Sequence, residues 1–223
     1  MLLTRAVAGL IFLFAVLATL FFGLAGTLHA GRAWAALAVF FGCAGLITAW
    51  LWFHDKPLLQ RRVKAGPGRE ADPVQNILQG LAGVVFLAAF AVPGLDMRLH
   101  WSQLPLTFSL AGDGMIAIGF LIVFLTFRAN SYAAGTIEIA EAQPVIARGP
   151  YAIVRHPMYS GTLVMILGIP LALGSWWGLI PAGLLIPVLI WRLLREEAFL
   201  VANLPGYAEY RSRVGCRLVP MFW

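Results

Sequence analysis

Long apolar runs constrain the fold of this chain more than any other feature. Runs of about 17–25 residues with few charges predict membrane-spanning helices, and six occur, at 6–28, 33–53, 76–95, 106–127, 157–173 and 176–194. The first is too long for a signal peptide and leads almost directly into the second. With 61% hydrophobic and 12% charged residues, the chain is predicted to be an all-α polytopic membrane bundle. We expect about six transmembrane helices, with five as the alternative.

The basic residues are distributed very unevenly around these segments. If all six cross the membrane, every one of the 16 lysines and arginines except Arg32 and Arg98 lies on one side. Such a bias marks the cytoplasmic side, which predicts cytoplasmic N- and C-termini and attraction to anionic membrane lipids. The net charge of +6 is therefore mainly topological, and no nucleic-acid-binding face is evident. The oligomeric state stays open.

Cysteines and histidines are too few and too scattered for a structural metal site. The two cysteines, Cys43 and Cys216, would lie at different depths, so no disulfide is expected. Three polar features invite interpretation. Asp113 is read as the N-cap of a helix over 114–127, with an intramembrane functional acid as the alternative. Residues 136–140 alternate as in a short strand, within a polar segment 128–148 that we expect to close over the start of the next helix. The 54–75 loop is read as a solvated connector or a lipid-facing lid.

The last two apolar segments are predicted to form a helical hairpin, because only Gly174 and Ser175 separate them. At 1.5 Å per residue the two arms have nearly equal lengths. The hairpin would thus return Glu196 and Glu197 to the membrane face where His156 begins the first arm. A short amphipathic helix is expected around Tyr207 and Tyr210.

The stretch of the sequence most suggestive of a binding or catalytic site is Arg155, His156 and Pro157. Proline suits the first turn of a helix, so His156 is expected at its N-terminal cap, where free N–H groups and Arg155 attract anions. Glu196 and Glu197 would receive an ammonium group or hydroxyls. Apolar walls are expected from Val154, Tyr159 and Leu163. S-adenosyl-L-methionine carries groups that match such a site: an amino acid, a ribose, a flat ring and a sulfonium. In the alternative interpretation there is no ligand site, Arg155 only marks the cytoplasmic side of the membrane, and Glu196 pairs with Arg192.

The order and spacing of several residues between about 140 and 220 resemble the isoprenylcysteine carboxyl methyltransferase family and the related phospholipid methyltransferases. The residues that carry the resemblance are Gly149, Tyr151, Arg155, His156, Pro157, Tyr159, Gly161, Glu196, Glu197, Tyr207 and Tyr210. The resemblance implies a metal-free integral membrane enzyme whose S-adenosyl-L-methionine pocket lies on the cytoplasmic side. All of these except Gly161 would line that pocket, and Tyr207 and Tyr210 would belong to a C-terminal lid. Residues 1–127 would face the substrate, and 128–223 would form the methyltransferase core.

The expected acceptor is lipophilic: a prenylated cysteine carboxylate, a phospholipid amine, or a small apolar thiol or acid. Arg192, Glu196 and Glu197 are the candidates for catalytic roles, with Arg192 orienting an acceptor carboxylate or serving only as an interfacial charge. Two rival functions remain. One is an NADPH-dependent membrane reductase of the sterol reductase type, which shares an Arg-His-Pro stretch but usually has Asn where this chain has Met158. The other is a non-enzymatic membrane accessory protein.

Overall fold

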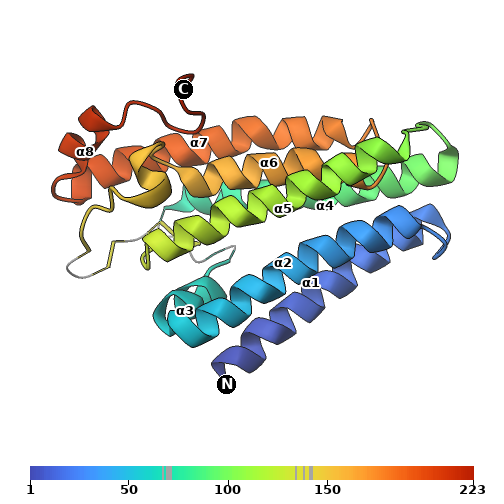
Figure 1. Ribbon diagram of the computed structural model, residues 1–223, viewed down its shortest axis with the longest axis horizontal. Coiled ribbons are helices and arrows are strands. Elements are labelled where there is room, and N and C mark those ends of the chain that lie inside the picture. Colours follow the sequence, from blue (N-terminus) through green and yellow to red (C-terminus); the bar gives the residue numbers. More distant parts are fainter. Residues whose placement is uncertain (67, 69–71, 134, 138, 141–142) are drawn as a thin grey trace.

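The computed structural model describes residues 1–223 except 67, 69–71, 134, 138 and 141–142. The described residues are helical and contain no strand, which confirms the predicted all-α bundle (Figure 1). Helices α1 (Leu2–Ala25), α2 (Gly31–His54), α4 (Pro73–Leu99) and α5 (Leu106–Ala129) come from the first four apolar runs. The short α3 (Lys56–Lys64) follows α2. The later elements are a 3₁₀ turn η1 (Gly149–Ala152), α6 (Pro157–Ala172), α7 (Leu179–Asn203) and α8 (Tyr207–Arg213).

Four of the six predicted spans are long and apolar enough to cross a membrane by themselves, namely α1, α2, α4 and α5. The most apolar windows of these helices are only 17–28% buried within the protein. Water would not tolerate so much exposed apolar surface, so lipid must cover it. The fifth predicted span, α6, is a 16-residue apolar helix. The sixth, α7, begins at Leu179 rather than 176 and runs to Asn203, well beyond its predicted apolar end.

Helices α5 and α6 pack together more closely than any other pair of helices. Glycines spaced seven apart on each helix face each other, Gly119 against Gly161 and Gly112 against Gly168. A Cβ placed on Gly119 would lie 2.6 Å from the backbone oxygen of Gly161, and one on Gly168 would lie 2.7 Å from that of Gly112. Only glycine permits this backbone approach, which in a membrane supplies the packing that the hydrophobic effect cannot.

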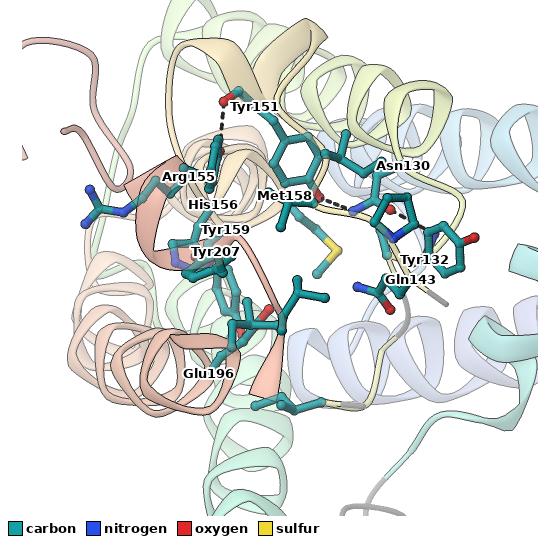
Figure 2. Close-up of a pocket in the computed structure, with 18 of the residues that line it drawn as sticks. Asn130, Tyr132, Gln143, Tyr151, Arg155, His156, Met158, Tyr159, Glu196 and Tyr207 are labelled. Atoms are coloured by element: carbon teal, nitrogen blue, oxygen red, sulfur yellow. Dashed lines mark hydrogen bonds between the residues drawn. The ribbon is translucent and has the colours of Figure 1, made fainter. Parts of the chain in front are cut away.

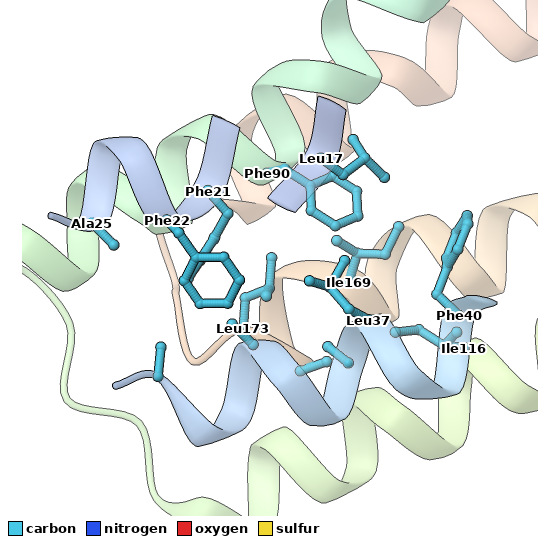
Figure 3. Close-up of a cluster of buried hydrophobic side chains, with 14 residues drawn as sticks. Leu17, Phe21, Phe22, Ala25, Leu37, Phe40, Phe90, Ile116, Ile169 and Leu173 are labelled. Atoms are coloured by element: carbon cyan, nitrogen blue, oxygen red, sulfur yellow. The ribbon is translucent and has the colours of Figure 1, made fainter. Parts of the chain in front are cut away.

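Aromatic and aliphatic side chains fill the largest core, where α1 and α2 meet α4, α5 and α6 (Figure 3). Its most completely buried members include Leu17, Phe21, Leu37, Ile116 and Ile169. This core ties the N-terminal pair of helices to the rest of the bundle. It lies toward the end of α1, the start of α2 and the end of α6, away from the start of α6.

Two of the polar features interpreted from the sequence have a different structure from the one predicted. Asp113 lies inside α5, which begins at Leu106, so its interpretation as an N-cap is wrong. The helix starts earlier, and Gly112 packs against Gly168 and Ala172 of α6. The strand suggested for 136–140 is also wrong for the described residues among them, which are irregular, while residue 138 lies outside the described part. Cys43 and Cys216 are both free, as expected.

The hairpin of α6 and α7 is confirmed, although its turn is longer than the two residues predicted. Residues 173–178 make the connection, and Gly174 adopts a positive φ of 79° there. The turn is anchored by Asp96, a buried carboxylate at the end of α4, which accepts hydrogen bonds from the hydroxyls of Ser102 and Ser175. From Leu179, Glu196 and Glu197 are about 27 Å along the helix, close to the length of α6. The geometry therefore returns them to the start of α6.

Candidate functional site

The start of α6 and the end of α7 meet as the sequence predicts. Pro157 occupies the first turn of α6 and His156 caps it in a non-helical conformation, with a φ of −127°. The Arg155 Nε atom lies 2.6 Å from a carboxylate oxygen of Glu197. These two groups, about forty residues apart in the sequence, thus share one end of the bundle.

A pocket opens beside this contact (Figure 2). The atom-free space between its walls is about 770 Å³, part of which is open solvent. Seven of the residues predicted to bind the cofactor line it: Tyr151, Arg155, His156, Tyr159, Glu196, Tyr207 and Tyr210. They come from η1, α6, α7 and α8, so the pocket exists only because these elements converge.

Among the described residues that line the pocket, the one with an acidic side chain is Glu196. The Tyr159 hydroxyl donates a hydrogen bond of 2.6 Å to its carboxylate. Tyr159 is buried on the first turn of α6, so it fixes the position of the Glu196 carboxylate. A negative charge is thereby held at the pocket wall.

Two buried polar atoms of the pocket lining have neither a hydrogen-bond partner nor an ion-pair partner among the described residues. They are Nε2 of His156 and the hydroxyl of Tyr207, on side chains that are each 4% exposed. Buried polar atoms without partners are costly and uncommon in folded proteins. Their position in the wall of a pocket indicates that a polar ligand completes them.

The imidazole of His156 is neutral at physiological pH. Burial lowers its pKa to about 4; the negative charge of Glu197 opposes this shift, and the positive charges of Arg155 and Arg217 add to it. A neutral imidazole has one donor and one acceptor nitrogen and does not repel a cation. His156 is therefore suited to a hydrogen-bonding role in this pocket.

The tyrosine hydroxyls of the pocket also stay uncharged. Burial raises the pKa of Tyr210 to about 12, and burial likewise raises the pKa values of Tyr151 and Tyr207. The Tyr210 hydroxyl donates a hydrogen bond of 2.8 Å to the backbone oxygen of Tyr151. The Tyr151 hydroxyl accepts a hydrogen bond of 3.0 Å from the side-chain amide of Asn130. Tyr151 and Tyr210 thus join η1, α8 and the end of α5 into one wall.

Arg155 lines the pocket with part of its side chain, but its guanidinium points away from it (Figure 2). Besides the contact with Glu197, the guanidinium donates 2.7 and 2.8 Å hydrogen bonds to the backbone oxygens of Val214 and Gly215. Arg217 donates 2.9 Å to the other carboxylate oxygen of Glu197. Burial alone would raise the pKa of Glu197, but Arg217 and Arg155 lower it overall. Glu197 is therefore a carboxylate held between two arginines, behind the pocket wall.

The C-terminal tail completes this arrangement through its backbone. The amides of Arg155 and His156 donate 2.9 and 3.0 Å hydrogen bonds to the carbonyls of Cys216 and Arg217, and the Ser160 hydroxyl donates 2.6 Å to that of Leu218. The tail therefore crosses the start of α6, which no pattern in the sequence indicated. The predicted lid residues, Tyr207 and Tyr210, lie in α8, which precedes this tail segment in the sequence.

Five other predicted site residues lie elsewhere. Gly149, Val154 and Pro157 line a second, apolar groove on another face of the same segment. Leu163 packs into the apolar core between α6 and α7. Arg192 is buried on α7, where its guanidinium donates to the Gln75 side chain and to the backbone oxygen of Gly135. Arg192 thus supports the loop before η1.

Several lining residues were missed from the sequence. They are contributed by the loop after α5, by the first turn of α6 and by the last turns of α7, and include Asn130, Tyr132, Gln143, Met158, Leu200 and Leu204. The polar segment 128–148 had been expected to close over the start of α6. That expectation was the only indication in the sequence that residues of this segment line the pocket, because none of them belongs to a recognisable motif.

The described residues hold no group of three or more His, Cys, Asp or Glu that would bind a metal. The chain matches the phospholipid methyltransferase family over residues 108–205, a stretch from α5 to the end of α7 that includes η1, His156 and both glutamates. No curated protein matches the chain. With its lipid-exposed helices, the chain is an integral membrane protein. Over residues 108–205 it is similar to the phospholipid methyltransferase family, a family of membrane methyltransferases.

Proposed function

We propose that the pocket binds S-adenosyl-L-methionine and that the protein transfers its methyl group to a lipophilic acceptor. The observation that carries the proposal is the pair of buried, unpartnered atoms, His156 Nε2 and the Tyr207 hydroxyl, beside the fixed carboxylate of Glu196. A polar ligand with both donors and acceptors would satisfy all three groups. The family match, which covers His156 and Glu196 and ends before Tyr207, supports a methyl donor as that ligand.

The charge of the pocket suits a cationic ligand. The guanidinium of Arg155 is neutralised by Glu197 and turned away, and His156 is neutral. Glu196 contributes a negative charge to the pocket wall, and a carboxylate stabilises both an ammonium group and a sulfonium. Apolar side chains from Val145, Leu200 and Leu204 offer walls for a flat ring.

When bound, S-adenosyl-L-methionine supplies an electrophilic methyl group on a positively charged sulfur. The residues of this chain hold the donor in place and exclude water, and alignment of reactants can contribute about 7–11 kcal/mol to a rate. His156, with its lowered pKa, is a weak base at neutral pH. We therefore favour an acceptor that arrives as an anion, such as the carboxylate of an isoprenylated cysteine or a related lipophilic acid or thiolate.

The acceptor would reach the pocket from the bilayer, because lipid-covered helices surround this end of the bundle. The uneven distribution of arginine and lysine supports a cytoplasmic location for the site and for both termini. In Figure 1 the basic α3 and α8 lie at the same end of the bundle as the start of α6. Membrane lipids and a lipidated or lipophilic small molecule are the partners that this placement favours.

The test is a binding measurement on the purified protein in detergent, by calorimetry with S-adenosylhomocysteine and, separately, with NADPH. We expect S-adenosylhomocysteine to bind and NADPH not to bind. Glu196→Gln should weaken binding about 10–100-fold, through loss of a charged contact. The matched control is Glu209→Gln on the exposed face of α8, which should bind as the native protein does.

Tyr207→Phe separates a ligand contact from a structural one. The hydroxyl has no partner among the described residues, so its removal should leave thermal stability unchanged while affinity falls about fivefold. Native affinity in both Tyr207→Phe and Glu196→Gln, or preferential binding of NADPH, would overturn the proposal. Methylation of a panel of lipophilic acids, thiols and amines with labelled donor would then identify the acceptor.

A further inference from the structure

An apolar groove lies on a different face of the segment that forms the pocket wall. It runs between the last turns of α5, the turn η1, the start of α6 and the C-terminal tail, and it encloses about 1260 Å³ of atom-free space that is open to the surroundings. Ile122, Leu125, Ile153 and Val154 contribute to its lining. Leu125 and Ile153 are exposed, 38% and 58%, although both are large and apolar.

One end of this groove is cationic. Arg128, in the last turn of α5, and Arg148, just before η1, both line it, and none of the described residues that line it is acidic. Both arginine side chains are exposed. The Nε atom of Arg148 lies 3.5 Å from the backbone oxygen of Ala129, next to Arg128 in the chain. The two guanidinium groups are therefore held near the same end of α5, and the part of the groove that the structure describes offers them no carboxylate.

The order of polar and apolar groups along the groove follows the depth of a membrane. Helix α5 is long and apolar enough to span the bilayer, and Arg128 lies at the end where it leaves it. Ile122 is six residues earlier, about 9 Å deeper along the helix axis. Headgroup-level arginines above an apolar channel match the layout of a phospholipid, with its phosphate outside and its acyl chain inside.

We propose that this groove binds an anionic glycerophospholipid, with the phosphate between Arg128 and Arg148 and one acyl chain along Ile122 and Leu125. The absence of acidic groups from the lining favours a lipid with a net negative charge over a zwitterionic one. Phosphatidylglycerol, a lipid of this kind, has no amine and no free carboxylate or thiol, so it is bound as a resident lipid and not as a methyl acceptor. The inference is independent of the function proposed for the pocket.

The experiment measures lipid retention by native mass spectrometry on the full-length protein in detergent. The probes are phosphatidylglycerol and phosphatidylcholine with identical acyl chains, added at equal concentration. We expect one phosphatidylglycerol to be retained in preference to phosphatidylcholine. The double substitution Arg128→Gln with Arg148→Gln should weaken that retention about thirtyfold, as expected for two lost cationic contacts at a membrane surface.

The control is Arg211→Gln with Arg213→Gln on α8, which makes the same change in net charge at exposed positions outside the groove. It should retain phosphatidylglycerol as the native protein does. Ile153→Glu gives a second route, because it places an acid in the groove at an exposed position and should also abolish retention. Equal retention of the two lipids, or equal losses in the groove and control variants, would overturn the proposal. S-adenosylhomocysteine binding, measured in parallel, should be unchanged in every variant.

Discussion

The contact of Glu197 with Arg155 and Arg217 holds the C-terminal tail against the start of α6, and Glu197→Gln should release it. The side chains of Arg155 and Glu197 are only 4% and 5% exposed, and removal of one partner from a buried ion pair costs about 3–5 kcal/mol. Arg155 would keep its hydrogen bonds to two tail carbonyls, and Arg217 is 25% exposed to solvent. We therefore expect the lower value, about 3 kcal/mol, which corresponds to an opening of the tail on the order of a hundredfold more frequent.

Hydrogen exchange measured by mass spectrometry reads this opening directly. The amides of Arg155 and His156 donate to the carbonyls of Cys216 and Arg217, so they exchange only when the tail leaves. In Glu197→Gln their exchange should accelerate about a hundredfold. The isosteric control Glu209→Gln, on exposed α8, should change it little. If the two variants exchange these amides at rates within about threefold of each other, Glu197 does not hold the tail and the reasoning is wrong.

Three further predictions concern other parts of the fold. Gly119→Ala should lower folded yield and melting temperature in detergent, because its Cβ would meet the Gly161 backbone, whereas Gly114→Ala on the same helix has no atom within 4 Å and should not. Stability should fall as pH drops from about 6.5 to 4, by up to about 3 kcal/mol, because unfolded His156 binds a proton that the folded protein does not; His156→Phe should flatten this dependence in pH-resolved melting curves. Asp96→Asn should lower the melting temperature by disturbing its serine hydrogen bonds, and equal melting of variant and native protein would contradict this role.

Much of the fold could be predicted because it depends on local properties of the chain. Apolar length alone marked α1, α2, α4 and α5, and Pro157 marked the first turn of α6. Two arms of similar length then required Glu196 and Glu197 to return to His156. Local reasoning failed at Asp113, because a single acid in an apolar run resembles a helix start, and the packing of α5 on α6 decides where the helix begins.

Half of the pocket could be predicted for the same reason. Tyr151, His156 and Tyr159 lie within a few residues of one another, so their proximity follows from the chain itself. The walls made by the loop after α5 and by the end of α7 could not be predicted, because their residues meet only after the helices pack. The course of the tail was equally hidden, since it depends on backbone hydrogen bonds and on the pairing of Arg155 and Arg217 with Glu197, which form only when the helices pack.

The roles of the two glutamates show where the amino-acid order stops being sufficient. Composition and spacing established a membrane-embedded helical protein in which an imidazole and a guanidinium meet two adjacent acids. Neighbouring residues on a helix point about 100° apart, so only one can face the pocket. The rotation of α7, set by its packing against α4 and α6, turns Glu196 toward Tyr159 and the pocket and Glu197 toward Arg155 and Arg217. That rotation is a property of the whole bundle, and no local segment of the chain encodes it.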